Sequence, residues 1–276
     1  MKRIGRLLSL LILFSGVSFA ESAEPMLDLG AGGGYDDNLN NASGDQKEGA
    51  AFASTWVLLG VSKKVFEKGS LYLDGGYEGS YFADFSDLTV SALTAKAGFL
   101  YSITDTTLIH LSPRGGVRYY GDSDRDATVY GALISVRDRI SPAFSARAAY
   151  RYTRNDAEES VFSYDSHRLG VSGEIKVRSD SYLTFGYAAN FSQSPFYQTA
   201  TAPTSPGGKG KRPSDTFGTN QVVLKTDTTA HILSVDWDQD LYRRIYLRLG
   251  YAYSFVVSDL ENYTDNFISG GIGYRF

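Results

Sequence analysis

Hydrophobic and polar residues alternate along much of this chain, most clearly in the last stretch, 264–276. One set of alternate positions is mostly apolar and includes Ile272, Tyr274 and Phe276, whereas the other is mostly small or polar and ends in Arg275. A period of two residues is typical of a β-strand with two different faces. Such a strand needs hydrogen-bonded neighbours on both edges, and the rest of the sequence predicts them.

Alternation bounded by turn-forming residues predicts about twelve strands in all. They cover residues 26–36, 51–65, 69–82, 88–103, 106–120, 127–139, 143–154, 163–177, 180–192, 226–238, 243–257 and 264–276. Each is roughly ten residues or longer, which is enough for a tilted strand to cross a bilayer. The alternation is not clean in 51–65 and 127–139, which leaves the strand count open by about two.

The connections between these segments alternate strictly between short and long. Tight turns fall at 67–69, 104–105, 141–142, 178–180 and 238–242, and longer polar loops cover 37–49, 83–87, 121–126, 155–162, 193–225 and 258–263. Outer-membrane barrels have short periplasmic turns and longer outer loops. The pattern therefore predicts an all-β fold, a closed antiparallel transmembrane β-barrel of about twelve strands with both termini in the periplasm. A soluble β-sandwich is the alternative.

The first twenty residues have the features of a signal peptide. A basic start that includes Lys2 and Arg3 is followed by an apolar stretch, 7–14, and by a small-x-small sequence that ends at Ala20. The apolar stretch is too short for a membrane-spanning helix, and the order of these parts is that of a secretory signal. We expect residues 1–20 to be removed and residues 21–276 to form the outer-membrane barrel domain. An uncleaved N-terminal helix is the alternative.

Composition supports a membrane barrel and excludes other classes. The chain has 20 Tyr, 16 Phe and 29 Gly but a mean hydropathy of only -0.22, a combination typical of transmembrane barrels. The absence of Cys rules out a disulfide framework and a thiolate metal site. A net charge of -4 is too small to indicate a nucleic-acid partner. The glycines at 30–34 lack the lysine and helix of a phosphate-binding loop, and no cofactor is predicted.

The carboxyl terminus, G-Y-R-F at 273–276, resembles the terminal signature of bacterial outer-membrane β-barrel proteins. In that family the barrel-assembly machinery recognises the last aromatic residue. The resemblance implies that Phe276 is an assembly signal and that outer-membrane lipid and lipopolysaccharide surround the barrel.

Residues 33–40, G-G-Y-D-D-N-L-N, resemble a motif near the start of β-barrel porins of Gram-negative bacteria, families that are defined mostly from sequence. The match covers one strand and its loop, so it implies a class of protein and no particular solute. One alternative is an Asx-rich turn at the end of a strand. Another is a cation site formed by Asp36 and Asp37.

The alternation assigns many charged residues to the inside of the barrel. Basic residues gather on the fifth to eighth strands: Arg114, Arg118, Arg137, Arg147, Arg151, Arg168 and Lys176. Acidic residues lie on the first and third strands, with Lys96 between the two groups: Asp28, Asp36, Asp74 and Glu78. Charges inside a barrel must be paired or hydrated, so the interior is either a water-filled pore or a plug of salt bridges.

The basic group points to a function in transport. A row of charged side chains in a pore selects ions by sign, and the arginine fork binds two oxygens of a carboxylate or phosphate at once. We therefore predict a porin-like pore for passive diffusion of small anionic solutes. In architecture it resembles the twelve-stranded channels for acidic sugars, which are lined with arginine. The alternative is a structural or export-associated barrel with a plugged lumen.

A second alternative is an outer-membrane lipid hydrolase. His110 and Ser112 share a strand face and could form a base and nucleophile pair. They resemble the H-x-S pair of outer-membrane phospholipase and lipid A deacylase, in which the pair faces lipid near the outer rim. Here the alternation points the pair inward beside Arg114, and Pro113 follows Ser112 directly.

Two further features concern the ends of the barrel. The long loop 193–225 is rich in Pro, Gly and Ser, and we expect it to cap or enter the mouth. Aromatic residues near the ends of strands predict girdles at the membrane interfaces: Trp237, Tyr242 and Tyr246 at one end, and Tyr119, Tyr120, Tyr150 and Tyr152 at the other.

Overall fold

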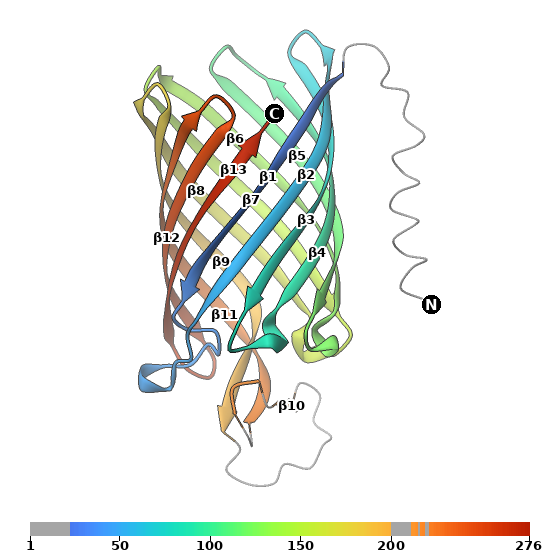
Figure 1. Cartoon of the computed structure of the whole chain (residues 1–276), viewed down its shortest axis with the longest axis vertical. Coiled ribbons are helices and arrows are strands. Elements are labelled where there is room, and N and C mark those ends of the chain that lie inside the picture. The colour runs from blue at the N-terminus through green and yellow to red at the C-terminus, as the bar shows by residue number, and fades with distance from the viewer. Residues whose placement is uncertain (1–22, 200–210, 215, 219–220) are drawn as a thin grey trace.

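Twelve long antiparallel strands form a sheet that closes on itself as a barrel (Figure 1). The structure is a computed structural model that describes residues 23–199, 211–214, 216–218 and 221–276, so the predicted signal peptide, 1–20, lies outside the described residues. The barrel strands are β1 (Glu24–Asp36), β2 (Ala50–Phe66), β3 (Gly69–Phe82), β4 (Val90–Ser102), β5 (Thr107–Tyr120), β6 (Ala127–Ser141), β7 (Phe144–Ala157), β8 (Tyr164–Arg178), β9 (Ser181–Thr199), β11 (Gln221–Tyr242), β12 (Ile245–Ser258) and β13 (Tyr263–Arg275).

The first and last strands pair with each other and close the sheet. Their antiparallel register runs from Asp28 opposite Arg275 to Asp36 opposite Phe267, and β9 pairs with β11 on the other side of the long connection. A closed sheet leaves no unpaired edge. This topology confirms the predicted twelve-strand barrel and excludes the soluble sandwich, which needs two sheets packed face to face.

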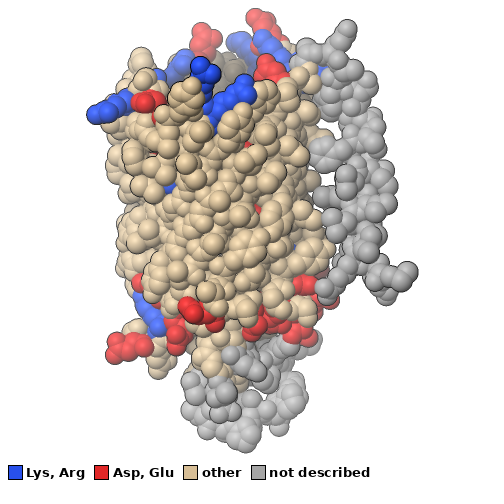
Figure 2. Space-filling view, viewed as in Figure 1, with Lys and Arg blue, Asp and Glu red and all other residues tan. Residues whose placement is uncertain are grey.

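The outer surface of the wall is apolar. In β9, for example, Phe185, Tyr187 and Phe191 point outward and each exposes more than two fifths of its surface. Figure 2 shows that the visible face of the wall carries almost no charge between two charged rims. Apolar side chains exposed over such an area suit contact with lipid. Among the described residues, no helix is long and apolar enough to cross a membrane.

The structure resolves the face of each residue in the two strands without clean alternation. In β2, Trp56 hydrogen-bonds to Asp28 inside the barrel, whereas Val57 and Leu59 are exposed on the outer surface. In β6, Tyr130 is exposed outside. Apolar residues occupy both faces of these strands, because some interior positions also pack against neighbouring side chains. A two-residue period of hydrophobicity therefore could not separate the faces.

The two ends of the barrel differ. Short turns join the strands at the end where β1 begins and β13 ends, and the long connections lie at the opposite end (Figure 1). The long connections contain four short 3-10 helices among the described residues: η1 (Gly44–Gln46), η2 (Ser86–Leu88), η3 (Ser123–Arg125) and η4 (Ser160–Phe162). We call these the turn end and the loop end.

The predicted loop over 193–225 is wrong at both of its limits. β9 continues to Thr199 and β11 already begins at Gln221, so that the two strands extend together past the loop end. A further short strand, β10 (Lys211–Ser214), pairs with β11 there. Buried apolar residues of the extension, such as Tyr197 and Val223, stabilise the pairing through contacts with other loops. The turn-forming residues around them concealed these strands in the sequence.

The motif at 33–40 fastens the first loop to the last strand. Asp36 accepts a hydrogen bond from the backbone N of Asn38 (2.9 Å), which confirms an Asx turn. Asp37 accepts from the backbone N and from Nδ2 of Asn266, both at 2.7 Å. Partial burial alone would raise the pKa of Asp37, but the bonds from Asn266 and the nearby Lys47 hold it below its ordinary value.

The carboxylates of Asp36, Asp37 and Asp265 also lie together, with oxygen atoms within 4.8 Å of one another. Such a group could hold a cation. The hydrogen bonds of Asp36 and Asp37 already explain why these residues lie there, so the spacing alone does not establish a metal site.

Candidate functional site: the barrel interior

Hydrogen bonds that pass over an intervening strand identify the inward-facing side chains. Arg114 on β5 donates from Nη2 to Oγ1 of Thr153 on β7 (2.7 Å), and Tyr246 on β12 donates from its hydroxyl to Asp28 on β1 (2.6 Å). β6 separates the first pair of strands and β13 separates the second. Side chains converge across a strand only on the concave face of a barrel, so these residues lie inside.

The structure places the predicted basic residues on the inside of β5 to β8. Arg147, Arg151 and Arg168 line one cavity of about 390 Å³, and each is exposed to the interior space. Arg151 and Arg168 are directly opposite each other on β7 and β8. Arg118 donates to Asn155 (3.3 Å) on β7.

Three of these arginines donate hydrogen bonds to neutral partners. Arg114 donates to a threonine hydroxyl, Arg147 to the hydroxyl of Ser135 at 3.1 Å, and Arg118 to an asparagine and a tyrosine. Within the part of the chain that the structure describes, none of the five forms a salt bridge with a carboxylate. We call Arg114, Arg118, Arg147, Arg151 and Arg168 the arginine group. It keeps its full positive charge inside the barrel.

Arg137 differs from the other predicted basic residues. Its Nη2 lies 2.5 Å from Oε1 of Glu174, so its charge is largely balanced near the turn end. The sequence alternation placed Arg137 on the correct face of β6. It could not show that Glu174, two strands away, would pair with it.

The structure places the predicted acidic residues on the opposite part of the wall. Asp28 accepts hydrogen bonds from Trp56 Nε1 (2.8 Å) and from Tyr246. Asp74 is buried and lies 3.7 Å from the Nζ of Lys96. Glu78 lies directly opposite Trp56 in the register of β2 and β3, and both residues line a cavity on this side of the barrel.

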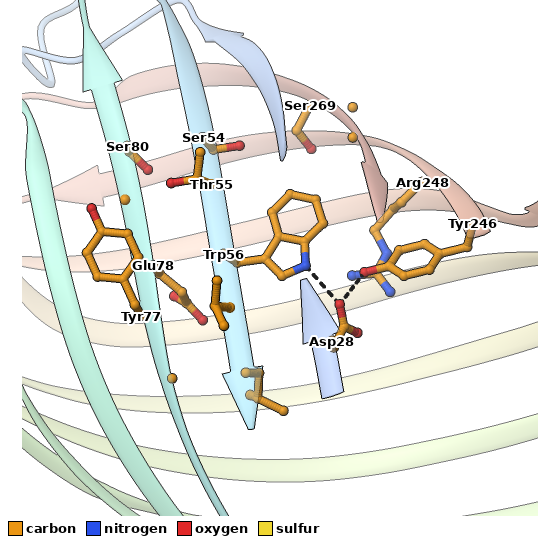
Figure 3. A pocket seen from close by; sticks show the side chains of 16 residues that line it. Asp28, Ser54, Thr55, Trp56, Tyr77, Glu78, Ser80, Tyr246, Arg248 and Ser269 are labelled. Carbon is orange, nitrogen blue, oxygen red and sulfur yellow. Dashed lines mark hydrogen bonds between the residues drawn. The ribbon is translucent and has the colours of Figure 1, made fainter. Parts of the chain in front are cut away.

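A second cavity, of about 430 Å³, lies on this acidic side (Figure 3). Figure 3 shows the indole of Trp56 at its centre, with Trp56 and Tyr246 both hydrogen-bonded to Asp28 and with Glu78 to the left of the indole. Arg248 enters the same space from β12 and lies 2.7 Å from Asp238.

Tyr246 corrects the predicted aromatic girdle. It is only 4 % exposed and hydrogen-bonds inside the barrel, whereas Tyr242 is exposed near the turn end. Tyr246 and Arg248 are two residues apart on β12 and therefore share a face. From this spacing, the inward position of Tyr246 could have been predicted. The distance of a residue from the end of its strand, on which the predicted girdle depends, does not determine its face.

The His110 and Ser112 side chains point inward but are joined through a third residue. The Tyr72 hydroxyl donates to Oγ of Ser112 (2.9 Å) and lies 2.7 Å from Nε2 of His110. The Tyr72 hydroxyl therefore lies between the two side chains, and among the described residues no hydrogen bond joins His110 directly to Ser112. The geometry favours a structural chain of hydrogen bonds over the base and nucleophile pair of a hydrolase.

At the loop end, apolar residues from several loops meet. Val161, Phe162, Tyr197, Phe217 and Val223 are buried there, and Leu39, Phe85, Leu88 and Ala157 pack against them. These residues come from the β1–β2 and β3–β4 connections, from the end of β7 and the β7–β8 connection, from the extension of β9 and β11, and, for Phe217, from the segment between β10 and β11. The connections lie on different sides of the barrel, so this mouth cluster reaches across the opening and narrows it.

Arg125, in the β5–β6 connection, joins the mouth cluster to a fifth loop. Its guanidinium lies 4.3 Å from the centre of the Phe162 ring and donates to the Tyr197 hydroxyl. Asp122 lies 3.6 Å from Arg125 Nε. Burial of a charge at this position requires these partners, so Arg125 contributes to fixing the arrangement of the loops.

Comparison with known proteins identifies the fold. A scan against protein-family models and a search of curated protein sequences each found no match. Among solved structures, an outer membrane channel from Pseudomonas putida is similar over 95% of this chain and 98% of its own, with 9% identity and a TM-score of 0.58. The NanC porin (12% identity, 91% of this chain and 100% of its own, TM-score 0.46) and the KdgM porin (9%, 91% and 99%, 0.45) are also similar.

These similarities concern the fold alone, because the identities are so low. Together with the closed sheet and its apolar outer surface, the similarity to the Pseudomonas putida channel places this chain among proteins with the fold of outer-membrane β-barrels.

Proposed function

We propose that this protein is a porin-like pore of the outer membrane, of the β-barrel porin type, through which small anionic solutes diffuse passively. The observation that carries the proposal is the arginine group: among the described residues none of its five cations forms a salt bridge, and the hydrogen-bond partners of Arg114, Arg118 and Arg147 are neutral. A plug held by salt bridges would balance these charges. Cations that remain unbalanced beside a cavity instead attract anions from solution.

The proposed orientation places both termini and the short turns in the periplasm and the long loops outside the cell. It is supported by the fact that β1 begins and β13 ends at the turn end (Figure 1), and by the usual arrangement of outer-membrane barrels. The partners implied are outer-membrane lipid, lipopolysaccharide and the diffusing solute.

Conductance measurements test the proposed pore. The purified protein, without residues 1–20, is inserted into a planar bilayer with potassium chloride at two concentrations. We expect stepwise conductance and a reversal potential that indicates preference for chloride over potassium. A stable barrel that inserts and shows no conductance would contradict the proposal.

A plugged barrel is the second candidate function, and the mouth cluster favours it. Five connections meet over the loop end, and backbone hydrogen bonds join neighbouring loops, such as Asp122 N to Asp87 O at 3.2 Å. A structural or export-associated barrel does not need a loop end that is wide enough for a solute to pass. Complete absence of conductance in the experiment above would support this candidate.

The terminal residue gives a separate prediction about assembly. The backbone of Phe276 pairs with Leu27 through bonds of 2.8 and 3.0 Å, while 52% of the residue is exposed. Replacing an exposed side chain changes stability by only about 0.5 kcal/mol. We therefore expect Phe276→Ala to refold normally in detergent, but to reduce the amount of folded protein in the outer membrane of cells several-fold.

Ile272→Ala provides the matched control, because Ile272 lies on the same strand with the same exposure, 52%. Folded protein in membrane fractions is measured by its altered migration in electrophoresis without heating. Equal assembly of both variants and the unaltered protein would show that Phe276 is not an assembly signal.

A further inference from the structure

The acidic side of the barrel contains a flat aromatic surface that the anion pore does not require. Trp56 Nε1 donates to Asp28 (2.8 Å), which fixes the orientation of the indole. Two glycines lie beneath the ring: a Cβ atom at Gly30 would overlap it, and one at Gly271 would come within 2.9 Å of it. The indole therefore lies against the backbone of β1 and β13. Its other face is turned toward the cavity (Figure 3).

Polar groups of both kinds surround this surface. Asp28 and Glu78 supply carboxylate oxygens, Arg248 supplies a guanidinium, and Ser54 and Ser269 supply hydroxyls. Glu78 forms no hydrogen bond or salt bridge within the described residues, so both of its oxygens are free to accept. Carboxylate and guanidinium groups are planar and bind two neighbouring partners at once.

We propose that this cavity is a binding subsite for a sugar ring, in which one face of a pyranose packs on Trp56 and its hydroxyls bond to Glu78, Arg248 and the serines. A pyranose has an apolar face and an edge of hydroxyls that both donate and accept, which matches this combination of groups. The cavity of about 430 Å³ is in the range of small-molecule sites. The inference rests on the proposed function in one respect: the sugar must be able to enter the lumen.

Other solutes fit this cavity less well. An organic cation would gain from Trp56 and the carboxylates, but Arg248 and Arg275 lie beside them, the latter 4.5 Å from the centre of the Tyr246 ring. A purely apolar solute would displace water from Glu78 without replacing its hydrogen bonds. An acidic sugar could also reach the arginine group from this wall, which would connect the subsite with the proposed anion preference.

The two tryptophans of the chain make the subsite measurable. Trp237 is directly opposite Leu249 in the register of β11 and β12, and Leu249 is exposed on the outer surface, so Trp237 faces away from the lumen. In the Trp237→Phe variant the tryptophan fluorescence comes from Trp56 alone, and in the Trp56→Phe variant it comes from Trp237 alone. Both are titrated in detergent with maltotriose, glucuronate, the open-chain polyol sorbitol, and choline.

We expect maltotriose or glucuronate to change the fluorescence of the Trp237→Phe protein in a saturable way. Sorbitol and choline should have no effect, and the Trp56→Phe protein should not respond. Adding Glu78→Gln to the Trp237→Phe protein should weaken sugar binding about five- to tenfold, as expected for one weakened hydrogen bond. A response to choline alone, or no response to either sugar up to about 100 mM, a concentration that would saturate a millimolar site, would overturn the proposal.

Failure of the subsite can be distinguished from failure of the pore. A protein that conducts chloride but shows no sugar-dependent signal from Trp56 retains the proposed function without the subsite. A protein that binds sugar in detergent but does not conduct in a bilayer retains the subsite, and the proposal of a pore is then wrong.

Discussion

Replacing Arg147 and Arg151 together by glutamate is expected to abolish or reverse the anion preference of the pore. Both residues lie on β7, four positions apart, and both line the same cavity. A unit charge about 4 Å from an ion contributes about 4 kcal/mol at an effective dielectric constant of 20. Since about 1.4 kcal/mol corresponds to a factor of ten, we expect the anion-to-cation permeability ratio to fall about tenfold or more.

The double variant should still fold. Arg147 and Arg151 are exposed to the interior, so the introduced carboxylates can be hydrated, and Arg114 and Arg168 are near enough to pair with them. On the lipid-facing side the same charges would be far more costly. A shift of register by one residue would move every one of these positions to the other face, but Thr153, at the same alternate positions of β7, hydrogen-bonds across β6 to Arg114 and fixes the inward assignment.

Lys68→Glu with Arg178→Glu is the matched control. It produces the same change in total charge, but both residues lie at the turn end, Lys68 within the β2–β3 turn and Arg178 at the end of β8. Reversal potentials are measured across a salt gradient for the two double variants and the unaltered protein. If the Arg147 and Arg151 variant folds well and keeps its selectivity, these residues do not determine which ions pass.

Acidic residues at the loop end oppose the arginine group at low salt. The long connections contain, among others, Asp45, Asp84, Asp87 and Glu158, and Figure 2 shows acidic side chains gathered along this rim. Exposed charges at the rim are screened over about 10 Å at 0.1 M salt, whereas charges in a narrow interior are screened less. The anion preference should therefore persist as salt is raised to this range.

The sequence was sufficient to predict the barrel because each strand carries its own local signal. Every predicted strand overlaps one strand of the structure, and the alternation of β5 and β7 placed Arg114 and Arg147 on the inward face. Charged residues are informative in this way, because lipid excludes them from the outer face. Aromatic residues are not, since they suit both lipid and a packed interior.

Trp56 illustrates what the sequence could not provide. Its place on the inner wall depends on Gly30, which faces it across β1 and β2, and on Gly271, which lies more than 200 residues away along the chain. The space that these glycines leave becomes visible only when the register of three strands is known. The sequence pattern also did not predict that Asp236 lines the lumen, although this residue occupies an inward position of β11 and lines the cavity that contains Arg147 and Arg151.

The mouth cluster was hidden for a related reason. Each connection contributes only one or a few apolar residues, such as Leu39 from the first and Phe85 from the second. No single loop has a pattern that predicts burial. The cluster exists because the barrel brings the ends of distant hairpins to one opening, where short apolar segments can cover one another.

Replacing Phe217 by alanine is expected to open the loop end. The Phe217 ring is 4.9 Å from that of Phe85 and 4.7 Å from that of Tyr197, measured between ring centres, so it joins the β3–β4 connection to the extension of β9 and β11. Removing a buried phenylalanine side chain costs about 3–5 kcal/mol. A loss of this size is enough to make a favoured closed arrangement of the loops the minor one.

Single-channel recordings should therefore show a severalfold higher average conductance for Phe217→Ala than for the unaltered protein, and hydrogen exchange should be faster in the loops that contribute to the mouth cluster. Phe185→Ala is the matched control, because Phe185 is exposed on the outer wall and touches none of these loops. If the unaltered protein does not conduct and Phe217→Ala does, the mouth cluster is the barrier. If conductance is unchanged although the loops exchange faster, solutes pass the loop end without displacing the cluster, and the arginine group alone controls their passage.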